Sequence, residues 1–224
     1  NLNLPVKNIF WYALNPFIII DMTGSLQFEP VMLFFLIWSL YKLQQHKWIW
    51  AAILLACSVS VKLIPLLFLP LFFQWFVKNE QNWLAGIKKI SLFYLIIIST
   101  IIILFLPFYS SNFIANYSNS VGLWFRNFEF NASFYYIFRE IGYLFRGWNE
   151  IAIHPWYLAT PLILSIFTKY RFPIFWTIAI VFSYQAYANN PWKENLAFVA
   201  LEYLIVFGVL IYELRKTKNY KIVK

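Results

Sequence analysis

Three charged side chains interrupt otherwise apolar parts of the sequence and are the first candidates for chemistry. Asp21 and Glu29 bracket a short polar stretch, and Lys62 lies between two apolar runs, where a cation is costly at bilayer depth. The ammonium can hold a phosphate carried by a lipid, pair with Asp21 or Glu29, or extend to the membrane surface. The carboxylates can act directly in a site, or Glu29 can serve structurally ahead of Pro30, which opens a helix.

A second group of candidates lies between residues 108 and 157, where aromatic side chains alternate with Asn, Ser and single charges. Arginine binds phosphate oxygens through paired contacts, and aromatic rings suit the faces of sugars. His154 begins an apolar run and is either a substrate contact or a structural hydrogen-bonding residue. The candidates for substrate or carrier binding are Gln27, Lys62, Arg126, Glu129, Arg139, His154 and Tyr157, and the candidates for catalysis are Asp21 and Glu29.

The composition decides which solvent these residues meet. Hydrophobic residues make up 62% of the 224 residues and charged residues only 12%, about half the charged share of a typical soluble domain. We therefore expect an integral, multi-pass membrane protein with membrane lipid around it. The net charge of +9 is assigned to its cytoplasmic rim, next to anionic lipid, and does not indicate a nucleic acid partner.

Continuous apolar runs with few interior charges predict helices, because open sheet edges cannot be satisfied in lipid. Residues 48–61 and 63–77 are each short for a full span and are expected to form a hairpin with its tip at Lys62. The expected fold is all-α, a polytopic transmembrane helical protein in a single domain over 1–224. Its eight short or full spans are expected near 8–20, 30–43, 48–61, 63–77, 90–107, 156–168, 172–187 and 196–213.

The long stretch between the fifth and sixth spans is expected to lie at the membrane surface. Residues 112–131 mix aromatic and polar side chains, a composition suited to the headgroup level. Residues 132–146 can form an amphipathic helix in the plane of the interface. The sequence therefore predicts one interfacial helix in addition to the spans.

The positions of lysine and arginine orient the predicted spans, because these residues collect in short cytoplasmic loops. If residues 21–29 face outward, most basic residues fall on the cytoplasmic side, whereas Asp21, Glu29 and Lys62 face outward. Gly24 is expected to permit a tight turn in the first outward loop. The sequence thus predicts a site on the non-cytoplasmic face.

Several other classes of protein receive less support. The sequence has no glycine-rich phosphate loop, no Cys or His spacing for a metal and no nucleophile elbow. A transporter or flippase for lipid-linked sugars predicts ionisable residues inside the spans and related halves, but Glu202 alone lies clearly inside a predicted span. A non-catalytic subunit of a glycosylation complex is the third alternative. Glu202 is expected to pair internally with a partner that the sequence does not name.

Four motifs, in this order, resemble the C-terminal part of bacterial multi-spanning mannosyltransferases of the GT-C superfamily. They extend over nearly the whole chain. The motifs are Leu-Asn-Pro-Phe-Ile-Ile-Ile-Asp-Met-Thr-Gly-Ser-Leu-Gln-Phe-Glu at 14–29, Ser-Val-Lys-Leu-Ile-Pro-Leu-Leu-Phe-Leu-Pro at 60–70, Phe-Glu-Phe-Asn-Ala-Ser-Phe-Tyr-Tyr at 128–136 and His-Pro-Trp-Tyr at 154–157.

The resemblance implies a transferase that takes a sugar, typically mannose, from a polyprenol-phosphate carrier. The acceptor is a hydroxyl of a glycan or lipid at the non-cytoplasmic face, here the periplasmic face of a bacterial inner membrane. In such enzymes a carboxylate acts as general base on the acceptor hydroxyl, and cations or a divalent metal stabilise the leaving phosphate. A lid of interfacial aromatic helix would keep water from the reacting sugar.

The chain departs from the family pattern at two places. Relatives carry histidine in a Gly-Asn-Leu-His-Phe-Glu style stretch where this chain has Gln27, and they carry more chain where this sequence has only residues 147–153. The carboxylate usually assigned as base lies in the first outward loop of the complete proteins, which is expected upstream of Asn1. The chain is therefore expected to be an incomplete C-terminal part that holds the carrier and acceptor half of the site.

Overall fold

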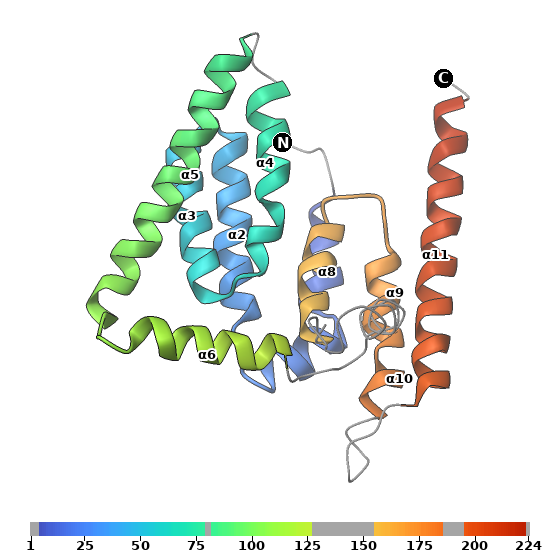
Figure 1. The fold of residues 1–224 in the computed structure, drawn as a ribbon. Helices are drawn as coiled ribbons and strands as arrows, with labels where there is room; N and C mark the ends of the chain where they lie inside the picture. Colours follow the sequence, from blue (N-terminus) through green and yellow to red (C-terminus); the bar gives the residue numbers. More distant parts are fainter. Residues whose placement is uncertain (1–4, 79–81, 127–154, 186–194, 223–224) are drawn as a thin grey trace, which may run out of the picture. The chain divides into compact units, whose positions relative to one another are not determined.

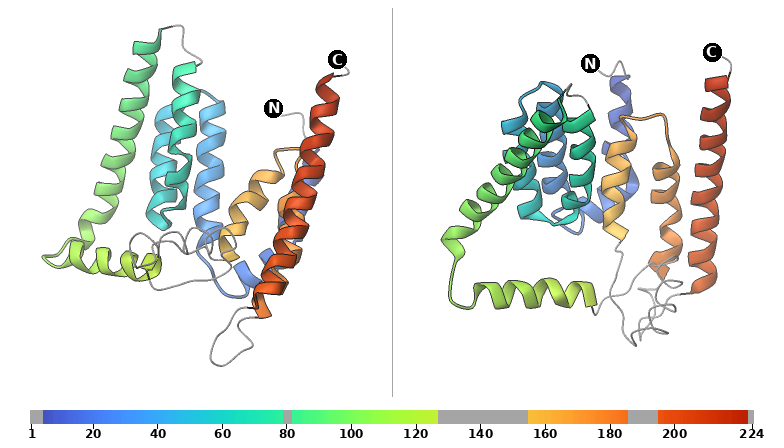
Figure 2. Two further views of the ribbon diagram at one scale, coloured as in Figure 1. Left: turned by 45° about the vertical axis from the view of Figure 1, so that its right-hand side comes forward. Right: turned by 45° about the horizontal axis from the view of Figure 1, so that its top comes forward.

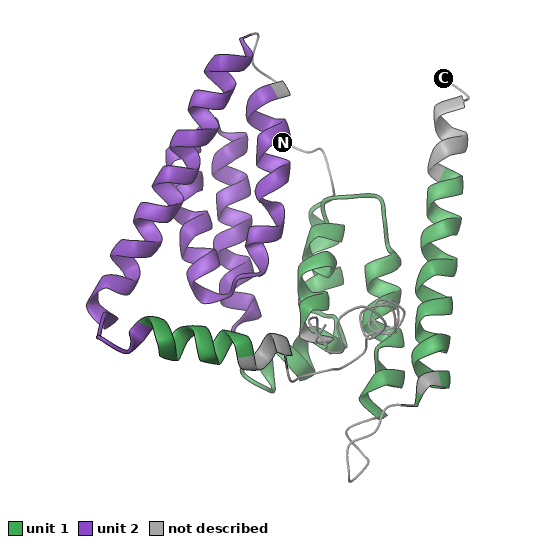
Figure 3. Cartoon of the chain, in the orientation of Figure 1, with its two compact units in different colours: residues 1–27, 114–224 green, residues 28–113 purple. Residues whose placement is uncertain are grey.

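The computed structural model describes residues 5–78, 82–126, 155–185 and 195–222. Within these ranges every regular element is a helix, as the sequence predicts, and no strand occurs. Figure 1 shows the helices coloured along the chain, and Figure 3 divides the chain into two compact units. Unit 1 comprises Asn1–Gln27 and Ile114–Lys224, and unit 2 comprises Phe28–Phe113.

Unit 2 is built from four helices that run alternately up and down (Figures 1 and 2). They are α2 (Glu29–Gln44), α3 (Trp48–Val61), α4 (Leu69–Lys78) and α5 (Trp83–Phe105). Helix α3 packs against both α2 and α5, and α4 packs against α5. The chain reverses direction at Lys62, as the sequence predicts, and a 3-10 helix, η3 (Ile64–Phe68), leads into α4.

Helices α2 and α3 approach closely because small side chains line their contact. Ala51, Ala52 and Ala56 of α3 are fully buried. The hydroxyl of Ser39 donates to the carbonyl of Ala51 at 2.7 Å, and the hydroxyl of Ser58 donates to the carbonyl of Met32 on the facing helix at 2.7 Å. In lipid, the hydrophobic effect does not drive helices together. Hydrogen bonds between helices and close packing of small side chains, as seen here, are the interactions that hold them together.

Aromatic side chains and one glycine join α4 to α5. The rings of Phe72 and Phe76 each lie 5.1 Å from the ring of Phe93, which is fully buried. The hydroxyl of Tyr94 donates to the carbonyl of Leu69 at 2.8 Å. A Cβ at Gly86 would lie 2.8 Å from the carbonyl oxygen of Phe76, so the backbones can approach this closely only at glycine.

Unit 1 contains the first 27 residues of the chain and its C-terminal half. Its N-terminal part holds η1 (Val6–Ile9), α1 (Phe10–Ala13) and a π-helix, η2 (Ile18–Thr23). The later part holds η5, α8, α9, α10 and α11, with α9 and α10 packed against α11. The bounds of these five elements are Pro155–Leu158, Ala159–Ser165, Phe172–Ala179, Val181–Tyr184 and Leu196–Ile222.

The first predicted span, 8–20, is wrong as a continuous helix. Helix α1 ends at Ala13, and π-helix η2 begins only at Ile18. Pro16 lacks the N–H that would continue the helix, and Oδ1 of Asn15 instead accepts from the backbone N–H of Phe17 at 3.0 Å. The Asn15 side chain also donates to Thr177 Oγ1 of α9 at 2.9 Å, so a hydrogen bond connects this break to α9.

Among the described residues, two helices are long and apolar enough to cross a membrane by length and composition, namely Trp83–Phe108 and Ala197–Lys216. Three shorter apolar helices, Trp48–Val61, Ile64–Val77 and Phe172–Tyr184, have the same character over fewer residues. The fifth predicted span begins earlier than expected, at Trp83, because Asn82 caps the helix by accepting from the N–H of Leu84. The total of eight spans stays a prediction.

Helix α6 (Phe113–Arg126) lies in the stretch expected at the membrane surface. Helical spacing places Phe113, Tyr117 and Val121 along one face and Asn116 and Asn119 along the other. The sequence prediction for 112–131 named a surface location without specifying a helix, and the helix is amphipathic as such a location requires. The amphipathic helix expected over 132–146 lies outside the described residues.

Candidate functional site

Glu29 and Lys62 form an ion pair at one end of unit 2. The ammonium Nζ of Lys62 donates to Oε1 of Glu29. Glu29 has no exposed surface, whereas the Lys62 side chain keeps 26% of its own. Of the three interpretations of Lys62, the structure therefore shows the ion pair with Glu29. A phosphate contact by the exposed part of Lys62 stays a prediction.

The antiparallel packing of α2 and α3 produces this pair. Glu29 is the first residue of α2, and Lys62 follows the last residue of α3, with an extended backbone at φ −151° and ψ 147°. The short turn between the helices contains His46 at φ 60°, so the start of α2 lies beside the end of α3. A carboxylate at a helix N-terminus is also favoured by the helix dipole.

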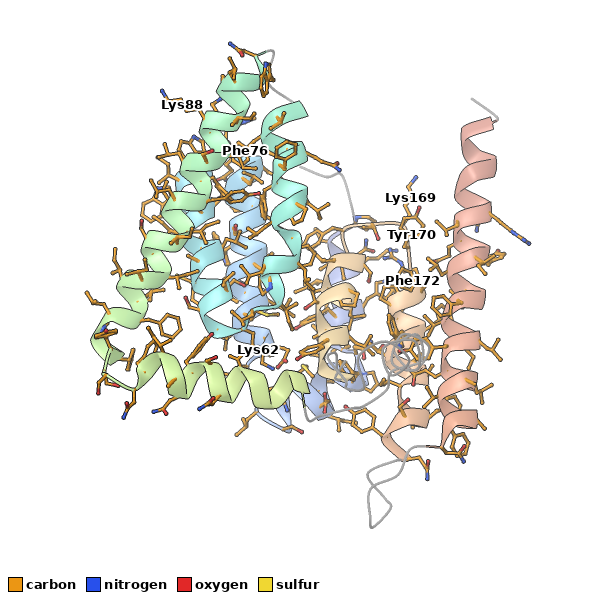
Figure 4. All side chains as sticks on the ribbon, viewed as in Figure 1. Lys62, Phe76, Lys88, Lys169, Tyr170 and Phe172 are labelled. Carbon is orange, nitrogen blue, oxygen red and sulfur yellow. The ribbon has the colours of Figure 1, made fainter. Side chains whose placement is uncertain are left out.

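The pair leaves one carboxylate oxygen without a protein donor. Oε2 of Glu29 is buried and makes no hydrogen bond to the described residues. Lys62 and Lys88 lie at opposite ends of unit 2 (Figure 4). The Lys88 end also contains the turns that carry Lys47 and Lys78, because the helices alternate in direction. The lysines at 47, 78 and 88 thus lie at the end of unit 2 opposite Glu29, as the sequence predicts. Which side of the membrane each end faces stays a prediction.

Asp21 lies in unit 1, on π-helix η2, and the backbone around it is unusual. A Cβ at Gly24 would lie 2.3 Å from the carbonyl oxygen of Ile20, so only glycine fits. Gly24 itself is helical, with φ −65°, so the turn expected there is present over residues 24–26 but does not use the conformational freedom of glycine. The left-handed conformation occurs instead at Leu26, with φ 51°. Single π-helical turns and strained residues of this kind concentrate at functional sites.

The Asp21 carboxyl group is half-buried, and burial raises its pKa above the usual value. The hydroxyl of Tyr184, at the end of α10, opposes this effect and lowers the pKa in part. Oδ2 of Asp21 is buried and makes no hydrogen bond of standard geometry.

The remaining predicted site residues are only partly placed. Gln27 is half-buried, and its backbone N–H donates to the carbonyl of Met22 at 3.0 Å. Tyr157 lies half-buried in η5. Arg126 is the last residue of α6. Glu129, Arg139 and His154 lie outside the described residues, so their roles stay predictions.

Two further carboxylates have partners that sequence reasoning did not identify. Glu202 is fully buried in α11, and it accepts from the indole N–H of Trp176 at 2.8 Å and from the hydroxyl of Ser183. Its position inside an apolar run indicated internal pairing, and the two described partners, Trp176 and Ser183, are neutral donors. Glu213 caps α9 by accepting from the backbone N–H groups of Arg171 at 2.8 and 3.0 Å and of Phe172 at 3.1 Å.

The described residues do not bring three or more His, Cys, Asp or Glu side chains together as a metal site. Participation of a divalent metal stays a prediction. The described site elements are thus a buried ion pair on unit 2 and a half-buried carboxylate on unit 1.

The chain is an integral membrane protein by class. This follows from its mostly hydrophobic sequence, its apolar helices of spanning length and its charged groups held at helix ends. A model of the ALG6, ALG8 glycosyltransferase family matches residues 6–122. This range is more than half of the 224 residues, so the chain belongs to that family. No curated protein matches the chain, and no solved structure matches it.

The family match confirms the broader part of the resemblance drawn from the motifs, a membrane glycosyltransferase of the GT-C superfamily. The matched range contains Asp21, Glu29 and Lys62. Mannose as the sugar and a bacterial setting are narrower statements that the family description does not include, and they stay predictions.

Proposed function

We propose that the protein moves a sugar, most simply mannose, from a polyprenol-phosphate carrier to a glycan or lipid acceptor. We place the reaction at the non-cytoplasmic face of the membrane, the periplasmic face if the host is bacterial. The Glu29–Lys62 pair supports this proposal most directly. It holds a cation at the end of a membrane helix, within the range that matches a glycosyltransferase family.

Lys62 is proposed to bind the carrier phosphate. When the sugar leaves, the bond between its anomeric carbon and the phosphate oxygen breaks, and the electron pair stays on the phosphate. A fixed ammonium stabilises that developing charge, and its effect is larger away from bulk water. The exposed part of the Lys62 side chain gives a phosphate oxygen access to it.

Glu29 is proposed as a positioning residue. Its side chain is fully buried and engaged with Lys62, so it is poorly placed to take a proton from an acceptor hydroxyl. It instead keeps the ammonium charged and directed to one place. Of the two candidate carboxylates, Asp21 is the one with exposed surface.

Gln27, Arg126, Glu129, Arg139, His154 and Tyr157 are proposed as contacts to the sugar or its carrier, on the chemical grounds given for their residue types. We place these residues with Asp21 and the ion pair in a single transmembrane domain. This assignment follows the prediction, from the positions of lysine and arginine, that these residues lie on the non-cytoplasmic face.

The proposal is tested by transfer of radiolabelled mannose from polyprenol-phosphate mannose to membrane acceptors, with the full-length protein in native membranes. Lys62→Met, Glu29→Gln and the double variant are compared at equal amounts of folded protein, with Lys88→Met as an exposed lysine control. Lys62→Met is expected to lower kcat roughly 100-fold or more, the effect of losing one charge-stabilising group. Lys88→Met is expected to transfer at the unmodified rate.

The double variant separates a functional role of Lys62 from a structural one. It removes both charges, so it is expected to fold more stably than Lys62→Met and still to be inactive. Recovery of activity in the double variant would show that Lys62 serves only to neutralise Glu29. Absence of transfer from every polyprenol-phosphate sugar offered to the unmodified protein would overturn the proposed function.

A further inference from the structure

A lysine in the last turn of α2 lies over two exposed aromatic rings. Nζ of Lys42 is 5.6 Å from the ring centroid of Trp38 and 5.8 Å from that of Tyr41. The two rings contact each other edge to face, with centroids 5.7 Å apart. Trp38 and Tyr41 keep 42% and 48% of their surface exposed. Contact with the ring faces holds the ammonium in place without neutralising its charge.

The end of α2 does not need this ammonium as a cap. The carbonyl oxygens of Tyr41, Lys42 and Leu43 accept from the backbone N–H groups of residues 45–47. The described residues give the Lys42 ammonium no hydrogen bond and no ion pair. An ammonium has three N–H donors and no acceptor, so all three remain available to an anionic ligand.

The turn between α2 and α3 brings a second lysine next to the first. The backbone N–H of Lys47 donates to the carbonyl oxygen of Lys42 at 3.0 Å, and the Lys47 side chain is exposed. His46 is also exposed and holds a left-handed backbone at φ 60°, a strained conformation that clusters at functional sites. In the described part of unit 2 the acidic residue is Glu29, which lies beside Lys62 at the opposite end (Figures 1 and 4). The turn therefore concentrates positive charge away from that carboxylate.

Exposed tryptophan side chains occur at the same end of unit 2. Trp50 lies in the first turn of α3, Trp75 lies in the second half of α4, and Trp83 begins α5. Tryptophan and tyrosine concentrate where the hydrocarbon of a membrane meets its headgroups, because the ring is apolar and its N–H or O–H is polar. These aromatic residues therefore put the ammonium groups of Lys42 and Lys47 at the depth of lipid phosphates.

We propose that the α2–α3 turn binds the headgroup of an anionic phospholipid, whose phosphate contacts Lys42 and Lys47. Phe34 is exposed and lies one turn before Trp38, with ring centroids 6.2 Å apart, so it continues the apolar surface for an acyl chain. This is a defined site, made by two particular lysines and the ring of Trp38. It goes beyond a general attraction of basic loops to the membrane, and it does not depend on the proposed transferase reaction.

Charge and shape both favour an anionic lipid as the ligand. A zwitterionic headgroup carries its own ammonium, which the two lysines repel, whereas a headgroup with a net negative charge is attracted by both. A soluble phosphate has no acyl chain to contact Phe34 and the exposed rings, so it gains less from this surface. The same chemistry sets the order of affinities to be tested.

Lipid binding is measured by native mass spectrometry of the full-length protein in detergent. The protein is titrated with phosphatidylglycerol or with phosphatidylcholine of the same acyl chains, and phosphatidylglycerol is expected to bind more tightly. Lys42→Gln and Lys47→Gln are each expected to weaken phosphatidylglycerol binding about 5-fold, and together about 30-fold, with phosphatidylcholine binding unchanged. Trp38→Leu removes the ring under the ammonium and is expected to weaken phosphatidylglycerol binding about 2- to 5-fold.

Two control variants separate a defined site from diffuse charge and from loss of fold. Lys88→Gln removes an exposed lysine at the same end of unit 2, one that contacts no ring among the described residues (Figure 4). It is expected to leave phosphatidylglycerol binding unchanged. Lys42→Arg keeps a cation over the rings and is expected to keep the preference for phosphatidylglycerol.

Three results would overturn the inference. The first is equal affinity of the unmodified protein for the two lipids. The second is a loss in Lys88→Gln as large as that in Lys42→Gln, which would show that only diffuse charge attracts the lipid. The third is displacement of phosphatidylglycerol by an excess of inorganic phosphate, which would assign the turn to a soluble anion. Sugar transfer is not part of this measurement, so a failure of the proposed reaction leaves its result unaffected.

Discussion

Replacement of Lys62 by methionine provides the most direct test of what stabilises the end of unit 2 that contains Glu29. Glu29 has no exposed surface, and the ammonium of Lys62 is the cation that contacts it. Loss of the cation leaves a buried carboxylate without a counter-charge, and such changes cost about 3 to 5 kcal/mol of unfolding free energy. Methionine keeps a similar length, so lost packing contributes little.

The reverse substitution is expected to be milder. Glu29→Gln leaves Lys62 unpaired, but part of this side chain is exposed, and the ammonium can turn toward water. We expect a cost of about 1 to 3 kcal/mol, the range for an unsatisfied buried polar group. The variant that combines Glu29→Gln and Lys62→Met buries no net charge, so it should be more stable than Lys62→Met alone.

The assay is reversible unfolding of the purified protein in mixed detergent micelles, followed by tryptophan fluorescence. The three variants form a double-mutant cycle, and contact between the residues predicts a coupling energy above about 0.5 kcal/mol. Lys88→Met, an exposed lysine on α5, is the control and should change stability by less than about 0.5 kcal/mol. If the double variant loses the sum of the two single losses, the ion pair does not stabilise this end of the unit.

Three further substitutions test contacts in unit 1 by the same unfolding measurement. Gly24→Ala is expected to cost about 1 to 3 kcal/mol because the new Cβ meets a carbonyl oxygen, whereas Gly208→Ala, which meets no atom within 4 Å, should be nearly neutral; equal effects would contradict the close approach. Glu202→Gln loses an acceptor for a buried hydroxyl and should cost about 1 to 3 kcal/mol; an unchanged stability would show that the buried carboxylate is not needed. Glu213→Ala removes the cap of α9 and should cost about 1 kcal/mol, and no loss would mean that water replaces the carboxylate.

Much of the architecture follows from local sequence. The apolar composition predicted a membrane protein. The continuous apolar runs predicted helices whose bounds agree closely with those of α2 and α3. The change of direction at Lys62 was predicted because a charged residue and Pro65 interrupt the run there. The break at Asn15 and Pro16 was missed, because apolar content alone does not reveal a lost backbone donor.

The partners of the charged residues depended on tertiary structure. The sequence by itself showed that Lys62 and Glu202 need partners in an apolar environment, since a lone charge there is costly. Which partners they have depends on the register of α2 against α3 and of α9 and α10 against α11. Register is determined by the packing of small and aromatic side chains between facing helices. Hydrophobic periodicity identifies each helix, but only this packing decides that Glu29 is buried beside Lys62 and that Glu202 accepts from Trp176.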